Sequence, residues 1–194
     1  MTLHRRDVVK ALLAERGDLL VVAGLGSSAW DCTAAGDHPL NFPMWGAMGC
    51  AAMTGLGLAL AQPARRVLVL TGDGEMLMGL GSLATLGVQR PQNLSVVVLD
   101  NERYGETGMQ ATHTAHGVDL AAIAKASGFA AAVLVRDMAG VAGVRKAVHL
   151  GSGPFFAQVK VVAEKIPLVL PPREGTVLKN RFREALLGKS ALLQ

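Results

Sequence analysis

Short, continuous apolar runs alternate with amphipathic stretches along most of the chain. Five of these runs are typical of strands buried on both faces, at residues 19–23, 66–71, 94–99, 131–135 and 155–162. Between them, the spacing of apolar positions predicts helices over 3–16, after Ser27, and over 76–88, 120–127 and 138–149, with a short extended segment at 40–42. The alternation predicts an α/β fold, with a doubly wound, mainly parallel sheet and helices on both faces.

One long uncharged stretch, residues 44–61, has the composition of a membrane span. It follows Pro43 and contains four glycines, and motifs typical of a nucleotide site lie on either side of it. These features favour a helix that packs against the sheet and is hidden on most sides. No membrane contact is therefore expected.

The pattern changes after Pro167, where a Pro-rich turn precedes a predicted terminal helix over about 176–183. This helix packs either on the domain or on a partner. The chain contains no repeats and no low-complexity segment. We expect a single domain over 1–194, with a core at about 18–165 and a C-terminal extension at 166–194.

The composition is that of a globular protein with a sizeable core, because 51% of the 194 residues are hydrophobic and 18% are charged. The N-terminal stretch is charged and amphipathic, unlike the apolar segment of a secretory signal. Cys32 and Cys50 lack metal-ligand spacing and are expected to be reduced thiols. A cytoplasmic location is expected.

The net charge of +4 does not indicate a nucleic-acid partner. The basic residues are scattered, aromatic residues make up only 4% of the chain, and no nucleic-acid-binding motif is present. A solvated basic surface is the simplest explanation, and a modest positive field also suits an anionic cofactor and an anionic substrate.

Polar residues follow two of the predicted strands. Asp73 lies between Gly72 and Gly74 after the strand at 66–71, and Asn101 follows the strand at 94–99. Parallel neighbours in a βαβ unit end at the same edge of the sheet, so these oxygen ligands should converge. The glycines permit a close approach of backbone to phosphate, and a helix beginning near Glu75 would aim free N–H groups at the same place. The pattern predicts a site for Mg²⁺ and a diphosphate.

The segment Gly72-Asp73-Gly74, followed after one helix and one strand by Asn101, resembles the thiamine diphosphate-binding motif of thiamine-dependent enzymes. The continuation Asp-Asn-Glu-Arg-Tyr-Gly-Glu-Thr-Gly-Met-Gln-Ala-Thr-His, at 100–113, is most similar to the β subunit, or C-terminal half, of sulfopyruvate and phosphonopyruvate decarboxylases. The resemblance covers roughly residues 20–165. It implies the thiamine diphosphate-binding fold and a decarboxylase that acts on a small anionic 2-oxo acid.

The resemblance also implies roles for particular residues. Asp73, Asn101 and the carbonyl of Arg103 would hold Mg²⁺. The loop Gly26-Ser27-Ser28 would contact the diphosphate. The Gly46 carbonyl would accept a hydrogen bond from the aminopyrimidine, and Met48 would hold the cofactor bent. The remaining cofactor-binding positions are Gly72, Gly74, Glu75, Tyr104 and Gly105.

Four of these positions have alternative interpretations. Glu75 stands where decarboxylases of this branch commonly have a small or hydroxyl residue, and its carboxylate would be repelled by a diphosphate unless it points away or offsets a helix dipole. Met48 could be an ordinary core residue. Tyr104 and Gly105 could simply shape the turn that presents the Arg103 carbonyl.

The resemblance implies that a partner completes the active site. Enzymes of this family activate the cofactor with a glutamate from a separate domain that precedes this one. The recognised domain occupies nearly the whole chain, and none of its seven glutamates lies in a preceding domain. We expect a hetero-oligomer in which a pyrimidine-binding α subunit supplies the catalytic glutamate.

Other functions remain open. The same half-site could serve a carboligase resembling acetolactate synthase, or a 2-oxo acid oxidoreductase whose iron–sulfur clusters all lie elsewhere; it could also be a degenerate half-site with a structural or regulatory role. Residues 24–29, Gly-Leu-Gly-Ser-Ser-Ala, match a dinucleotide fingerprint, but no acid follows at the required distance. His113 could contact substrate or only hydrogen-bond within its loop, and His113 with His116 makes a poor metal pair.

Overall fold

The computed structural model describes residues 2–193, and its centre is a six-stranded sheet in which all neighbouring strands are parallel. The strand order is β2-β1-β3-β4-β8-β7. The strands are β1 (Leu20–Ala23), β2 (Asn41–Pro43), β3 (Val67–Gly72), β4 (Leu94–Asp100), β7 (Ala131–Val135) and β8 (Phe155–Lys160). The α/β class and the parallel sheet predicted from the sequence are confirmed.

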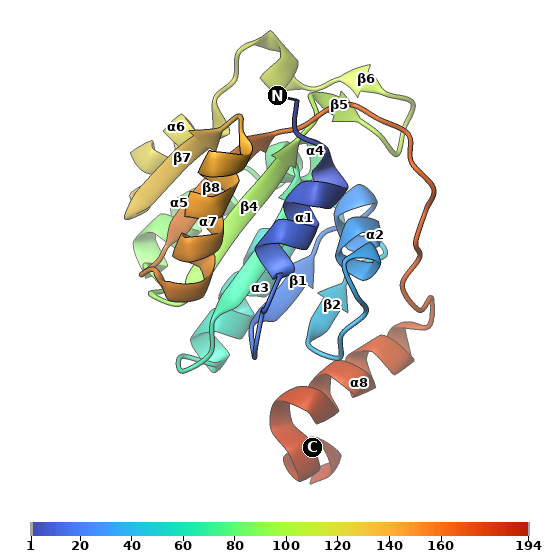
Figure 1. Ribbon diagram of the computed structural model, residues 1–194. Helices are drawn as coiled ribbons and strands as arrows, with labels where there is room; N and C mark the ends of the chain where they lie inside the picture. Colours follow the sequence, from blue (N-terminus) through green and yellow to red (C-terminus); the bar gives the residue numbers. More distant parts are fainter. Residues whose placement is uncertain (1, 194) are drawn as a thin grey trace.

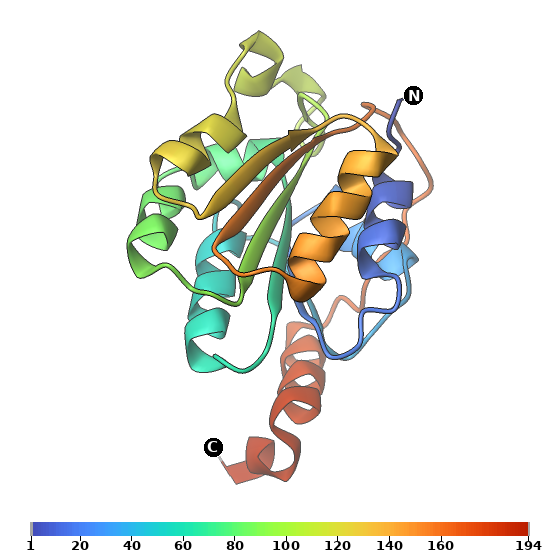
Figure 2. The same ribbon diagram turned by 60° about the vertical axis from the view of Figure 1, so that its left-hand side comes forward.

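Helices cover both faces of the sheet (Figures 1 and 2). One face carries α1 (Arg5–Leu13), α2 (Ser27–Ala34) and α7 (Met138–Leu150). The other carries α3 (Ala51–Ala61), α5 (Ser82–Gln89) and α6 (Leu120–Ala126). The remaining helices are α4 (Asp73–Met78), α8 (Gly175–Leu187) and the short 3-10 segments η1 (His113–His116) and η2 (Gly188–Leu193).

Each central strand contributes side chains to two separate cores. Along β3, Leu68 and Leu70 pack under α1, α2 and α7, whereas Val67 and Val69 pack under α3, α5 and α6. Side chains of a strand point alternately to opposite faces, so a strand covered on both sides must be apolar at every position. This is the physical reason why the apolar runs are continuous.

The chain reverses its direction of travel across the sheet beside β1. From β1 it passes outward to the edge strand β2, and then returns past β1 to form β3. The loops that follow β1 and β3 therefore leave the sheet in opposite directions and open a crevice at the carboxyl ends of the strands. The predicted diphosphate loop and the Gly-Asp-Gly turn both border this crevice.

The single helix predicted over 76–88 is wrong, because the structure has two helices there. α4 begins at Asp73 and ends at Met78, and α5 begins at Ser82. The break contains Gly79, whose Cβ, if present, would lie 2.2 Å from the Gly49 carbonyl oxygen. Two backbones thus meet at this point, and only glycine permits the contact.

The long apolar segment 44–61 is helical only from Ala51 onward. Its first part is a loop in which Ala47 and Gly49 have positive φ angles of 58° and 93°. The helix is less hidden than its composition predicts, since Met53 is 42% and Leu60 is 53% exposed. In residues 2–193, no helix combines the length and apolar character needed to cross a membrane.

The C-terminal helix packs on the domain itself. Residues 161–174 run along the outside of the molecule to α8, which lies beyond the end of β2 (Figure 1). The Phe182 ring meets Phe42 edge-on at 5.5 Å between centroids, and Arg181 forms an ion pair with Asp37 at 2.6 Å. The terminal helix predicted from the sequence is confirmed, and its contacts are with the region of β2.

We expect Phe182→Ala to lower the free energy of unfolding by about 3 kcal/mol, because it removes a buried aromatic ring and leaves a cavity. Val177→Ala on the same helix is the control, since Val177 is 51% exposed and should change stability by less than about 0.5 kcal/mol. Chemical denaturation measures both. Equal, small effects would mean that α8 is not docked on the domain in solution.

Candidate functional site

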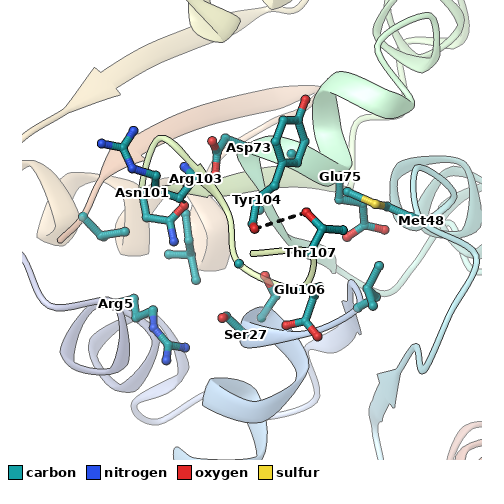
Figure 3. Close-up of a pocket in the computed structure, with 17 residues that line it drawn as sticks. Arg5, Ser27, Met48, Asp73, Glu75, Asn101, Arg103, Tyr104, Glu106 and Thr107 are labelled. Carbon is teal, nitrogen blue, oxygen red and sulfur yellow. Dashed lines mark hydrogen bonds between the residues drawn. The ribbon is translucent and has the colours of Figure 1, made fainter. Parts of the chain in front are cut away.

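A cavity of about 620 Å³, part of it open to solvent, lies in the crevice at the carboxyl ends of β1, β3 and β4. Figure 3 shows the residues around it. Besides Val161, its lining comes from five segments that are separated in the sequence: Arg5; Leu25, Ser27 and Ser28; Met48; Gly72–Glu75; and Leu99, Asn101, Arg103, Tyr104, Gly105, Glu106 and Thr107. Most of the predicted cofactor-binding residues are therefore brought to one place.

Asp73 begins α4 directly after β3 and is only 2% exposed. Its Oδ2 accepts hydrogen bonds from the hydroxyls of Thr112, at 2.6 Å, and Thr114, at 3.3 Å. The pKa of Asp73 is raised to about 6, chiefly by burial and also by the charge of Asp100, against the opposing effect of the hydroxyl donors. A cation beside this carboxylate would stabilise its charged form.

Asp100, at the end of β4, contacts the same pair of threonines through Thr114. Its carboxylate accepts from Thr114 Oγ1 at 2.7 Å and from Gln158 Nε2 at 2.6 Å, and it forms an ion pair with Lys160 at 2.8 Å. Asp100 and Lys160 face each other in the β4–β8 register. A continuous hydrogen-bonded network therefore runs from Asp73 through the two threonines to a charge pair in the sheet.

Thr112 and Thr114 belong to the candidate site through their contacts with Asp73, and the sequence did not identify them. Both are buried, whereas His113 between them is exposed. The two threonines flank His113 in the sequence, and the structure places Thr112 at the N-cap of η1 and Thr114 within it. Nothing local, however, identifies Asp73 as their partner.

Asn101 and Arg103 form a tight turn after β4. Asn101 Oδ1 accepts a hydrogen bond from the Arg103 backbone N–H at 3.0 Å, and Glu102 between them has a positive φ of 62°. Arg103 then enters a two-stranded antiparallel ribbon of β5 (Arg103–Tyr104) and β6 (Gln110–Ala111). The turn holds Asn101 and the Arg103 backbone at the cavity, where Asp73 also lies.

Tyr104 packs directly against the Gly-Asp-Gly turn. A Cβ on Gly74 would lie 2.6 Å from Tyr104 Cδ1, so the ring occupies the space that any other residue would fill. The Tyr104 hydroxyl lies 3.4 Å from His113 Nδ1. Gly105 follows and is exposed. Tyr104 thus ties the loop after β4 to the turn after β3.

The loop Gly26-Ser27-Ser28 begins α2 at the cavity. Gly26 has a positive φ of 75°, and no side chain caps the first turn of the helix, so its N–H groups are available to an anion. The Glu106 carboxyl lies over this loop, 2.6 Å from where a Cβ on Gly26 would be. Burial raises the pKa of Glu106, and the charge of Arg5 opposes that shift.

Met48 and Gly46, the two residues predicted to contact the pyrimidine of the cofactor, differ in their position relative to the cavity. Met48 is half-buried, lines the cavity and lies outside both hydrophobic cores, so the ordinary-core interpretation is not supported. Gly46 is on the exposed loop before α3 and does not line the cavity.

The carboxylate of Glu75 is held inside the protein. It is 5% exposed, and its Oε2 accepts from the Thr71 hydroxyl at 2.7 Å. Burial raises the pKa of Glu75, while the Thr71 hydroxyl and backbone N–H groups oppose the shift. This arrangement explains how a carboxylate is accommodated at the position where the sequence departs from the decarboxylase pattern.

An apolar hollow adjoins the cavity and shares Met48, Gly74, Tyr104 and Thr107 with it. Its other walls are Leu77, Met78, Leu80, His113, Val118 and Ile123. Met78, in the wall of this hollow, is 68% exposed and adds apolar surface beside the polar cavity.

The described residues 2–193 contain no group of three or more His, Cys, Asp or Glu side chains that could hold a metal ion. His113 and His116 therefore do not belong to such a cluster, and both cysteines are free thiols. The set of Asp73, Asn101 and the Arg103 carbonyl is of another kind, with one carboxylate and two neutral oxygens, as suits Mg²⁺ bound together with phosphate.

Comparison with known proteins agrees with this geometry. The family described as thiamine pyrophosphate enzyme, C-terminal TPP binding domain, matches residues 26–159. The chain is 40% identical to a protein named sulfopyruvate decarboxylase subunit beta from Methanothermobacter thermautotrophicus, over 97% of this chain and 98% of that one. It is 47% identical to a phosphonopyruvate decarboxylase from Streptomyces viridochromogenes, over 66% of this chain and 32% of that one.

A solved structure of a putative thiamin diphosphate-dependent enzyme from Mycobacterium smegmatis has the same fold, with a TM-score of 0.71 and 23% identity over 84% of this chain and 32% of that one. The sequence resemblance to thiamine-dependent enzymes is confirmed. The chain belongs to the thiamine pyrophosphate enzyme family, as a C-terminal domain that binds this cofactor, thiamine diphosphate.

Proposed function

We propose that this chain is the diphosphate- and Mg²⁺-binding subunit of a 2-oxo acid decarboxylase that acts on sulfopyruvate or phosphonopyruvate and releases CO2 and an aldehyde. The proposal depends on one combined observation. The chain is similar over nearly its whole length to a sulfopyruvate decarboxylase β subunit, and its Asp73 and Asn101 lie together in the crevice of the sheet. Thiamine diphosphate supplies a nucleophilic carbon and an electron sink, which is the chemistry that a 2-oxo acid needs to lose CO2.

In this proposal the residues of the chain bind and orient the cofactor. Asp73, Asn101 and the Arg103 carbonyl hold Mg²⁺, and the start of α2 at Ser27 and Ser28 binds the diphosphate. The donor set fits, because Mg²⁺ takes a few protein oxygens and completes its shell with phosphate and water. The raised pKa of Asp73 fits as well, since a buried carboxylate gains most from a cation.

Met48 and the Gly46 carbonyl orient the pyrimidine side. Met48 stands at the border between the polar cavity and the apolar hollow, where it can support a bent cofactor. Gly46 would meet the cofactor beyond the cavity wall, on the exposed side of the same loop.

We further propose that a partner subunit covers this site and supplies the catalytic glutamate. The name "subunit beta" of the full-length relative supports a hetero-oligomer. The apolar hollow supports the position of the partner, because exposed apolar surface beside a polar cavity is typical of an interaction site. His113 lines this hollow and is proposed to contact substrate.

The metal proposal predicts opposite effects of Asp73→Asn with and without Mg²⁺. Without metal at pH 8, the variant should be more stable than the native chain by on the order of 2–3 kcal/mol, because a buried charge is removed. The native carboxyl has a raised pKa of about 6, so its folded state gains stability as pH falls through 6 towards 4, and the difference should vanish there. With Mg²⁺ at pH 8, only the native chain should be stabilised.

Thermal unfolding across pH 4–8, with and without Mg²⁺, measures these effects. Asp7→Asn is the control, because Asp7 is exposed on α1. Equal stabilisation of both chains by Mg²⁺ would remove Asp73 from the metal site.

The partner proposal predicts that the purified chain alone is nearly inactive. Adding the subunit that co-purifies with it from its native cell should raise CO2 release from sulfopyruvate or phosphonopyruvate by at least about a hundredfold, the usual contribution of a general acid–base group. The faster substrate identifies the branch. Full activity of the chain alone would refute the need for a partner, and a ligated product in place of an aldehyde would establish a carboligase.

A further inference from the structure

The Glu75 carboxylate lies among hydrogen-bond donors from several segments that border the cavity. Its Oε2 accepts from Thr71 at the end of β3, at 2.7 Å, and its Oε1 accepts a longer hydrogen bond from the Ala51 backbone N–H, at 3.4 Å. The backbone N–H groups of Ala51, Gly49 and Leu25 all lower the pKa of Glu75, against the larger effect of burial. The carboxylate therefore accepts hydrogen bonds from the end of β3 and from the first residue of α3, and backbone N–H groups of the two loops at Leu25 and Gly49 favour its charged form.

These donors belong to the loops that form the cavity. Leu25 lies between β1 and the start of α2, where Ser27 and Ser28 line the cavity. Gly49 and Ala51 directly follow Met48 and lead into α3. Figure 3 shows Glu75, Met48 and Ser27 together around the cavity.

Gly24 leaves the space that the carboxylate occupies. A Cβ on Gly24 would lie 1.8 Å from Glu75 Oε2 and 2.7 Å from its Cδ. The Gly24 backbone cannot easily move aside, because its N–H donates to the Leu70 carbonyl at 2.8 Å and so continues the β1–β3 pairing. The clash would have to be relieved by the Glu75 side chain.

This contact explains the first glycine of the glycine-rich pattern at 24–29 without a bound dinucleotide. Gly24 is needed here for a neighbouring carboxylate of the same chain. A buried carboxylate is also costly unless its hydrogen bonds are satisfied, so this one is expected to hold its donors in a fixed arrangement.

We propose that Glu75 is a positioning residue that fixes the loops at 24–28 and 48–51 to the end of β3, and that Gly24 is glycine because it accommodates the Glu75 carboxylate. The inference rests on the proposed function only in assigning the shaped cavity to thiamine diphosphate. Glu75 itself is not a catalytic residue in this proposal, because it acts through the loops.

The test compares Glu75→Ala, Glu75→Gln, Gly24→Ala and the double variant Gly24→Ala/Glu75→Ala with the native full chain, alone and with its co-purifying subunit. Titration calorimetry with thiamine diphosphate and Mg²⁺ should show a dissociation constant at least tenfold weaker for Gly24→Ala and Glu75→Ala. Glu75→Gln should lose less, since an amide oxygen still accepts a hydrogen bond. The double variant should be no weaker than the weaker single variant, because the two changes disrupt the same contact.

Gly57→Ala on α3 is the matched control, since no atom lies within 4 Å of its added Cβ, and it should bind like the native chain. A second readout needs no cofactor: hydrogen exchange at residues 25–28 and 48–51 should accelerate in Glu75→Ala and Gly24→Ala and stay unchanged in Gly57→Ala.

The outcomes separate the two proposals. Unchanged hydrogen exchange in both loops, or additive losses in the double variant, would overturn the positioning role. Native cofactor affinity in Glu75→Ala and Gly24→Ala would also overturn it. Faster exchange in the variants of a chain that does not bind thiamine diphosphate, even with its partner, would instead contradict the proposed function and leave the loop anchor standing.

Discussion

Two carboxylates, those of Asp73 and Asp100, are buried at the ends of neighbouring strands, and one of them, Asp100, is paired with a positively charged side chain. Lys160 pairs with Asp100 across the β4–β8 register, whereas Asp73 is bound by hydroxyls that carry no charge. Among the ion pairs formed within residues 2–193, none reaches Asp73. The fold thus maintains a localised negative charge at the carboxyl edge of its sheet, at the cost of a raised pKa.

Several features of the surrounding structure hold Asp73 in a fixed position. Thr112 and Thr114 link Asp73 to Asp100 with hydroxyl donors, which satisfy the oxygens without neutralising them. The ribbon of β5 and β6 brings the threonines back to the sheet after the turn at Asn101. Tyr104 packs on Gly74 and closes the side of the turn. A diphosphate and its metal would meet a rigid oxygen ligand here, with helix N–H groups nearby to receive the phosphate.

The sequence predicted the sheet and the convergence of Asp73 and Asn101 at its edge because both depend on local or periodic signals. Continuous apolar runs identify strands covered on both faces, and glycines around an acid at a strand end identify a turn that approaches a ligand. What it missed depends on contacts between distant residues. The partnership of Thr112 with Asp73 spans 39 positions. The break between α4 and α5 results from the contact of Gly79 with Gly49. The spacing of apolar positions along a predicted helix does not reveal such a contact.

The apolar surface beside the cavity connects the buried charge of Asp73 with the proposed binding of a partner subunit. On the proposed function, the chain provides the polar half of the site, in which oxygen ligands and helix N–H groups hold the metal and the phosphates. The apolar hollow begins where those groups end, and Met48 and Tyr104 belong to both. A partner that buries the hollow would also exclude water from the cavity and strengthen the electrostatic interactions inside it. Covering the hollow would therefore strengthen the binding of a cation by Asp73. The attraction between the two charges increases as the surrounding water is removed.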